Sequence, residues 1–145
     1  MLVTSAESMI ELGRRLASQL RAGDLVILSG EMGAGKTTFV RGIGDFLGVE
    51  TSSPTFVISR AHETNPKLVH SDLYRLLGEG DLARQIEELD INFGEDAIHL
   101  IEWGEELTKD LDREFLLIRF AQGDSESDRE VEFVANGKRW EQLAI

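Results

Sequence analysis

The segment Gly30–Thr37 reads GEMGAGKT, and it constrains the fold of this chain more than any other feature. It matches the phosphate-binding loop G-x-x-x-x-G-K-[ST] at every fixed position. The apolar run Leu25–Leu28 enters the loop as a buried strand would, and Thr37–Leu47 followed by Gly48 is typical of a helix that ends at a glycine cap. A strand, a glycine-rich turn and a helix in this order predict a P-loop within an α/β sheet.

The residue types in this loop suit the binding of a nucleotide phosphate. Gly33 and Gly35 can adopt positive φ angles, so the backbone can curve around an anion and direct its N–H groups at it. The Lys36 ammonium would lie on the β- and γ-phosphates. The Thr37 hydroxyl is a hard oxygen ligand for the Mg²⁺ that bridges the same phosphates.

The composition fits one domain over residues 1–145 and excludes several kinds of site. The chain is 41% hydrophobic, which is enough for a core, and it has no cysteine, so disulfides and thiolate metal sites are excluded. The first residues lack the basic and apolar regions of a secretory leader, and no apolar run reaches the roughly 18 residues of a membrane span. We therefore expect a cytoplasmic protein without a membrane attachment.

The net charge of −12 lies in the second half of the chain. Residues 1–76 carry eight acidic and eight basic side chains, whereas residues 77–145 carry nineteen acidic and seven basic ones. Because nucleic-acid binding needs clustered lysine and arginine, this chain is poorly suited to hold RNA by itself. The acidic half is either a solubilising face or a surface that docks a basic partner.

Hydrophobic periodicity along the chain predicts an α/β fold. Helices are expected over Ser5–Arg21, with a Thr4–Glu7 capping box, over 79–92 and over 138–143, and strands over Phe56–His62, Leu68–Asp72, Ala97–Glu102, Phe115–Ala121 and Glu130–Ala135. The first two of these strands would form one hairpin and the last two another. The predicted fold is a single-domain P-loop NTPase whose mixed sheet has parallel strands at its centre and antiparallel hairpins at its edges.

Two carboxylates lie where a P-loop enzyme needs them. Asp72 ends one predicted strand and Glu102 ends another, and ligand sites of open α/β sheets lie at the carboxyl ends of strands. Glu102 is a candidate ligand of Mg²⁺, through water, or a base that orients water, and Asp72 could take the other role. The alternative for each is a strand-end cap or a surface charge.

Other polar residues carry weaker signals. The segment Ser53–Phe56 lies where switch NTPases often supply a hydroxyl to Mg²⁺ or the γ-phosphate, although an ordinary loop is an equal alternative. His62, His70 and His99 show no metal-ligand spacing and are expected to pack in the core or a hairpin. The chain has no N-K-x-D guanine signature, which disfavours a GTPase. No second substrate domain or arginine-rich lid is evident, which disfavours a small-molecule kinase.

Taken together, four motifs resemble those of the TsaE (YjeE) family of small bacterial P-loop ATPases. In chain order they are Gly33–Thr38, Ser53–Phe56, His70–Arg75 and Ile101–Trp103. The resemblance implies that the phosphates of ATP are held by Gly33, Ala34, Gly35, Lys36, Thr37 and Thr38. It implies that the residues at the Mg²⁺ site are Thr37, Asp72 and Glu102. It also implies that the catalytic residues are Lys36, Asp72, Glu102 and the switch residue Thr55.

The same resemblance implies a role in making N6-threonylcarbamoyladenosine at position 37 of tRNAs that read ANN codons. Family members are similar to an ATPase subunit that works with the proteins TsaD and TsaB, so contact with tRNA would be indirect. Two alternatives remain open, a non-hydrolytic ATP-binding regulatory module and a small phosphotransferase. The adenine pocket is not located by the sequence, although Thr4–Glu7 is a candidate segment.

Overall fold

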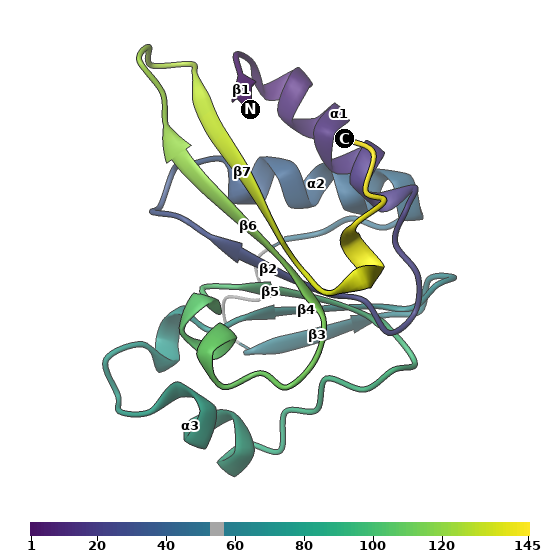
Figure 1. Cartoon of the computed structure of the whole chain (residues 1–145), viewed down its shortest axis with the longest axis vertical. Helices are drawn as coiled ribbons and strands as arrows, with labels where there is room; N and C mark the ends of the chain where they lie inside the picture. Colours follow the sequence, from purple (N-terminus) through teal and green to yellow (C-terminus); the bar gives the residue numbers. More distant parts are fainter. Residues whose placement is uncertain (53–56) are drawn as a thin grey trace.

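The computed structural model describes residues 1–52 and 57–145, which form a seven-stranded sheet in the order β1-β7-β6-β2-β5-β4-β3 (Figure 1). The strands are β1 (Leu2–Val3), β2 (Leu25–Ser29), β3 (Ser59–His62), β4 (Leu68–Asp72), β5 (Ile98–Glu102), β6 (Phe115–Gln122) and β7 (Arg129–Asn136). The helices are α1 (Ala6–Ala17), α2 (Lys36–Leu47) and α3 (Leu82–Glu88), with short 3₁₀ helices at Tyr74–Leu76, Glu105–Lys109 and Lys138–Trp140.

The strand directions match the predicted mixed sheet. At the centre, β2 runs parallel to both β5 and β6, and β4 runs parallel to β5. At one edge β3 pairs antiparallel with β4, and at the other β7 pairs antiparallel with β6 and β1. The α/β fold with central parallel strands and antiparallel edge hairpins is therefore confirmed.

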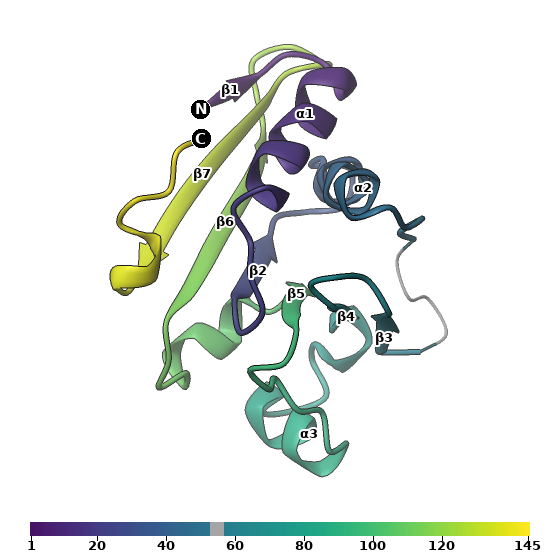
Figure 2. The same ribbon diagram turned by 90° about the vertical axis from the view of Figure 1, so that its right-hand side faces the viewer.

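The central strand β2 is buried on both faces. Val26 and Leu28 face a core that includes Phe39 of α2 and Leu16 of α1. Leu25 and Ile27 face a second core that includes residues of α3 and of two 3₁₀ helices. Figure 2 shows α1 and α2 on one side of the sheet and α3 on the other. A strand covered on both faces needs apolar residues at every position, which explains the uninterrupted apolar run before the P-loop.

Helices α1 and α2 approach each other backbone to backbone. A Cβ atom on Gly42 would lie 2.0 Å from the carbonyl oxygen of Ile10, and one on Gly13 would lie 2.2 Å from that of Phe39. No side chain larger than hydrogen fits at either position without separating the helices. The two glycines therefore fix the position of α2, whose N-terminus follows the P-loop.

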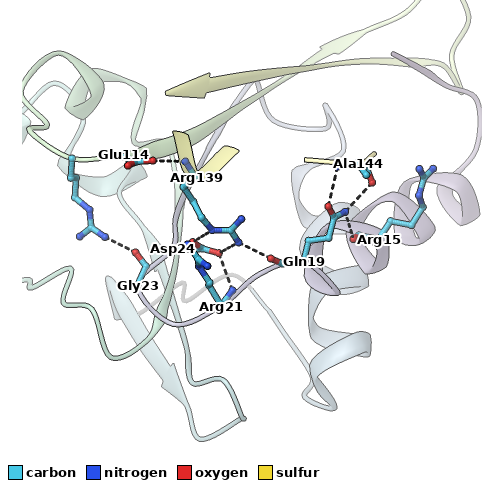
Figure 3. Close-up of polar contacts among 9 residues, drawn as sticks. Arg15, Gln19, Arg21, Gly23, Asp24, Glu114, Arg139 and Ala144 are labelled. Carbon is cyan, nitrogen blue, oxygen red and sulfur yellow. Dashed lines mark hydrogen bonds and ion pairs between the residues drawn. The ribbon is translucent and has the colours of Figure 1, made fainter. Parts of the chain in front are cut away.

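The C-terminal segment is tied to the connection between α1 and β2 (Figure 3). Arg139 donates from Nε to Asp24 Oδ1 at 2.8 Å and from Nη2 to both Asp24 Oδ2 and Gln19 O at 2.6 Å. The Gln19 side chain exchanges two hydrogen bonds with the backbone of Ala144, at 2.9 and 3.0 Å. Since Asp24 precedes β2, this tie stabilises the end of the sheet opposite to the P-loop.

Helix α1 differs from its predicted form at both ends. Its N-cap is Ser5, whose Oγ accepts from Ser8 N at 3.1 Å, so the predicted Thr4–Glu7 capping box is wrong. The helix ends at Ala17 rather than near Arg21, because the amides of Gln19 and Leu20 bond to carbonyls three residues back and the chain then turns at Gly23, which has a φ of 94°. A short polar capping group fits either serine or threonine, so the sequence alone did not distinguish them.

Three other boundaries also differ. The acidic helix predicted over 79–92 is confined to α3, which begins after its N-cap Asp81. The predicted strand 56–62 starts at Ser59, and only three residues of the expected C-terminal helix are helical, in 3₁₀ form. The two-residue strand β1 was missed, since its pairing with β7 is a tertiary contact. None of the described helices has the length and apolarity that crossing a membrane requires.

Candidate nucleotide site

A pocket of about 680 Å³ lies at the carboxyl ends of three parallel strands. Asp72 at the end of β4 and Leu28 of β2 are both in register with Glu102 at the end of β5. The P-loop, which follows β2, therefore meets both carboxylates, as the strand-end argument predicted. The expected site residues that line the pocket are Gly33, Gly35, Lys36, Thr37, Thr38, Asp72 and Glu102.

The P-loop has the backbone conformation that phosphate binding requires. Gly33 and Gly35 have φ angles of 79° and 108°, which L-residues with a Cβ rarely adopt. Gly35 is also the N-cap of α2 and offers no side-chain capping bond, so the first amides of the helix lack a capping side chain. An anion at this helix N-terminus would accept hydrogen bonds from those amides and would lie at the positive end of the helix dipole.

Ala34 has a different position from its neighbours in the loop. Its methyl group is buried in the core on the α1–α2 side of the sheet, and its N–H donates to the Glu31 carbonyl at 3.2 Å. Ala34 is not among the residues that line the pocket. In this structure it holds the loop against the core, and its amide is engaged within the loop.

The Lys36 side chain is buried in the pocket, with only 5% of the residue exposed. Its Nζ donates to the carbonyl of Glu31 at 2.9 Å and to that of Gly30. Burial lowers the pKa of Lys36, although the charges of Glu102, Asp72 and Glu31 oppose this effect. The ammonium is thus desolvated, and within residues 1–52 and 57–145 the acceptors of its hydrogen bonds are neutral carbonyls, which a phosphate could replace with stronger charge-assisted bonds.

The two carboxylates have distinct surroundings. Glu102 is 2% exposed, and its Oε2 lies 2.7 Å from His70 Nε2. Asp72 is only partly buried, and its Oδ1 accepts from Tyr74 N at 3.0 Å. Burial raises the pKa of Asp72, the Tyr74 amide opposes this rise, and the negative charge of Glu102 adds to it. One carboxylate is therefore enclosed, while the other is nearer to solvent.

Trp103 forms part of the wall beside Lys36. Its φ of 62° lies in the left-handed region, where a non-glycine residue is uncommon, and it turns the chain sharply after β5. The indole centroid lies 4.2 Å from Lys36 Nζ and 5.1 Å from the ring of Tyr74. The structure thus places Trp103 against the candidate phosphate-binding lysine.

Segments far from the P-loop in sequence hold it in place. Arg129 donates from Nε to the Gly33 carbonyl at 3.1 Å. A Cβ on Gly35 would lie 2.9 Å from Met9 Cε, and one on Gly30 would lie 2.4 Å from the Phe120 carbonyl. The start of α1 and the β6–β7 hairpin thus form the part of the pocket beyond the loop. Its remaining lining residues include Ser5, Ala6, Met9, Met32, Ser127 and Arg129.

These groups fit a magnesium nucleotide better than a metal held by protein alone. Among residues 1–52 and 57–145, no three His, Cys, Asp or Glu side chains are arranged to hold a metal ion. Mg²⁺ commonly keeps several waters and takes one or two protein ligands plus substrate phosphates. Thr37 with Asp72 or Glu102 could supply that number, and the glycine turns and desolvated Lys36 suit the phosphates.

Comparison with known proteins identifies the family. The model of the family described as "Threonylcarbamoyl adenosine biosynthesis protein TsaE" matches residues 3–131. The chain belongs to the TsaE family. It is 48% identical over 141 residues to the tRNA threonylcarbamoyladenosine biosynthesis protein TsaE of Streptomyces coelicolor, covering 91% of this chain and 93% of that protein. It is 36% identical over 131 residues to the protein of the same name from Bacillus subtilis, covering 88% and 79%.

A solved TsaE-like structure agrees with the fold. The crystal structure of Bacillus subtilis YdiB superimposes with a TM-score of 0.77 at 29% identity, covering 99% of this chain and 88% of that one. The resemblance inferred from the four motifs is therefore confirmed. The TsaE family and the P-loop type of fold make this a nucleotide-binding protein of the threonylcarbamoyladenosine pathway.

Two residues that the sequence singled out, Thr55 and His70, have different outcomes in this TsaE chain. Thr55, with the rest of Ser53–Phe56, lies outside the described residues, so its switch role stays a prediction. His70 is buried, as expected, but its contact with Glu102 brings it to the nucleotide site. The alternation of His70 and Asp72 in one strand places the two side chains on the same face, but it does not specify the contact with Glu102 on the neighbouring strand.

Replacing Asp72 by asparagine is expected to raise the free energy of unfolding at neutral pH by less than about 1 kcal/mol, since Asp72 is partly exposed and screened by solvent. The raised pKa of Asp72 means that its charged form is disfavoured in the fold, so the carboxylate lowers stability above the folded pKa. The gain in unfolding free energy should disappear as the pH falls below the pKa that Asp72 has in the unfolded chain. Urea unfolding of both proteins at several pH values measures this; a gain that grows toward acid pH would contradict it.

Proposed function

We propose that this protein binds and hydrolyses Mg-ATP as a subunit that supports the formation of N6-threonylcarbamoyladenosine at position 37 of ANN-decoding tRNAs. It would do so through a complex of TsaD and TsaB. The observation that carries the proposal is the convergence of the P-loop, Lys36, Asp72 and Glu102 in one pocket of about 680 Å³. Membership of the TsaE family supports the pathway.

The residues around the pocket suit distinct parts of ATP. Backbone amides at the start of α2 and the Lys36 ammonium would bind the phosphates, and the Thr37 hydroxyl would bind Mg²⁺. Magnesium would supply charge neutralisation at the phosphates. Asp72 and Glu102 would bind the metal's waters or orient the attacking water, and we propose Thr55 as the switch residue. The presence of Asp72 and Glu102 among the residues that line the pocket supports their part of this assignment.

The other part of the pocket suits the nucleobase. Ala6, Met9 and Met32 present apolar surface there, which a flat purine can cover. Ser5, Ser127 and Arg129 line the same part of the pocket and could orient a base or ribose, while Ser5 also caps α1 and Arg129 also bonds to the P-loop. The candidate segment Thr4–Glu7 is represented in the pocket by Ser5 and Ala6.

Action through protein partners agrees with the charge of the molecule. With a net charge of −12, the chain lacks the excess of lysine and arginine that direct tRNA binding requires. An acidic ATPase would therefore reach tRNA only through TsaD and TsaB. The acidic second half of the chain supports protein docking as well as solubility.

The proposal is tested by measuring phosphate release from Mg-ATP by the purified protein, alone and with TsaD and TsaB. We expect a slow basal rate that rises when both partners are present. Glu102→Gln is the matched variant, since it keeps the size of the side chain but removes its charge; it should bind Mg-ATP and release little phosphate. Threonylcarbamoyladenosine formed on tRNA by the complex is the second readout.

Two outcomes would replace this function with another. ATP binding without phosphate release in either condition, with tRNA modification intact in the Glu102→Gln variant, would favour a non-hydrolytic regulatory module. ATP consumption that requires an acceptor other than water would favour a phosphotransferase.

A further inference from the structure

We propose that His70 is a positioning residue that holds the Glu102 carboxylate for its work at the nucleotide site. The inference rests on the proposed function, because it gives Glu102 a task that depends on its orientation. His70 would act through Glu102 and would not touch the nucleotide.

The contact between these side chains is short and enclosed. His70 Nε2 lies 2.7 Å from Glu102 Oε2, and the two side chains are 1% and 3% exposed. They come from the parallel neighbours β4 and β5, where His70 is in register with Leu100 and Glu102 with Asp72. The imidazole therefore extends past Leu100, its register partner, to the residue two positions further along β5 toward the pocket. The register of the sheet thus sets the geometry of the pair.

The surroundings of the ring determine the direction of the hydrogen bond. Within residues 1–52 and 57–145, His70 Nδ1 is buried and has no hydrogen-bond partner. A proton on this nitrogen would be a buried, unbonded N–H, which is among the least tolerated groups in proteins. The neutral ring with its proton on Nε2 avoids this cost. His70 Nε2 then donates and Glu102 Oε2 accepts.

A neutral donor has a specific advantage at this position. It fixes the carboxylate without adding a positive charge that would compete with Lys36 or Mg²⁺ for it. Glu102 also lies in register with Asp72, the other carboxylate that lines the pocket, so the orientation of its side chain decides which way its oxygens face. A glutamate has several rotatable bonds, and a fixed hydrogen-bond partner reduces the number of side-chain conformations in which its oxygens face away from the nucleotide site.

The first test compares His70→Leu, which removes the donor, with His70→Gln, which keeps an N–H at similar reach. We expect His70→Leu to lower kcat for Mg-ATP about 10- to 100-fold, the usual effect of losing such a partner, with Kd for Mg-ADP changed less than about threefold. His70→Gln should recover most of the loss. A purely structural role would instead lower stability and affinity together, without recovery by glutamine.

His99→Leu is the matched control. His99 is also a buried strand histidine, and its Nε2 contacts the Gly94 carbonyl at 2.9 Å, but it lies at the start of β5, away from the pocket. This variant should keep wild-type kcat even if its unfolding free energy falls. Wild-type kcat in His70→Leu, or equal loss in His99→Leu, would overturn the positioning role.

A second readout does not depend on hydrolysis or on the leucine variant. Proton–nitrogen correlation spectra of the histidine rings should show neutral His70 protonated at Nε2, and Glu102→Gln should shift this resonance while leaving His99 unchanged. A proton on Nδ1, or no shift, would overturn the proposal. If the wild type binds Mg-ATP but releases no phosphate, alone or with its partners, the proposed function fails. The spectra then decide the His70–Glu102 link separately.

Discussion

Replacing Lys36 by methionine is expected to weaken Mg-ATP binding at least about 100-fold, the equivalent of two charge-assisted hydrogen bonds of about 1.5 kcal/mol each. Methionine matches the length of the buried stem but carries no ammonium for the phosphates. Isothermal titration with Mg-ATP and with Mg-ADP measures the loss. Phosphate release should fall with it, because both depend on the same group.

Folding stability should change in the opposite direction. The pKa of Lys36 is lowered by burial, so its charged form is disfavoured in the fold and costs stability below the folded pKa. The variant should therefore be at least as stable as the wild type at neutral pH, and the difference should vanish as the pH rises above the pKa of an unfolded lysine. Lys138→Met, at an exposed position, controls for net charge. Near wild-type affinity in Lys36→Met would refute the site.

Replacing Gly42 by alanine is expected to lower the free energy of unfolding by about 3 kcal/mol, a large part of the 5–15 kcal/mol that holds a typical domain together. Alanine normally favours a helix over glycine, so propensity alone predicts the opposite sign. The clash decides the result, since the new methyl group would lie 2.0 Å from the Ile10 carbonyl and backbone cannot rotate away.

Arg41→Ala is the control for this substitution, because Arg41 is the exposed neighbour on the same helix. It should change stability by less than about 0.5 kcal/mol. Gly13→Ala should resemble Gly42→Ala, since Gly13 faces the Phe39 carbonyl across the same contact. Urea unfolding of all three variants measures the effect. A Gly42→Ala protein as stable as Arg41→Ala would show that the helices are not in close backbone contact.

The sequence predicted those features whose cause is local. The apolar run of β2, the glycine loop and the helix after it are adjacent in the chain, and their order defines the P-loop. Asp72 and Glu102 could be paired in advance because each ends a predicted strand, and parallel strands end at the same edge of a sheet. The fold class followed from the same alternation of elements.

Other parts of the site depend on contacts that no local pattern records. Met9 and Arg129 reach the P-loop from α1 and β7, and Arg129 bonds to a residue 96 positions away. The short strand β1 exists only through its pairing with β7. His70 was visible as a buried strand residue, but its contact with Glu102 depends on the register between β4 and β5. Register and long-range packing arise only when the chain is folded.

The support of the P-loop by distant segments has a thermodynamic consequence. Because Met9, Phe120 and Arg129 contact loop residues, an opening motion that displaces α1 or the β6–β7 hairpin also disrupts the pocket. A nucleotide present at 100 times its Kd reduces the population of every such opening about 100-fold, or about 2.7 kcal/mol. Bound nucleotide would therefore slow amide hydrogen exchange at both ends of the sequence, in α1 and in the hairpin, although the ligand contacts only a few of those residues.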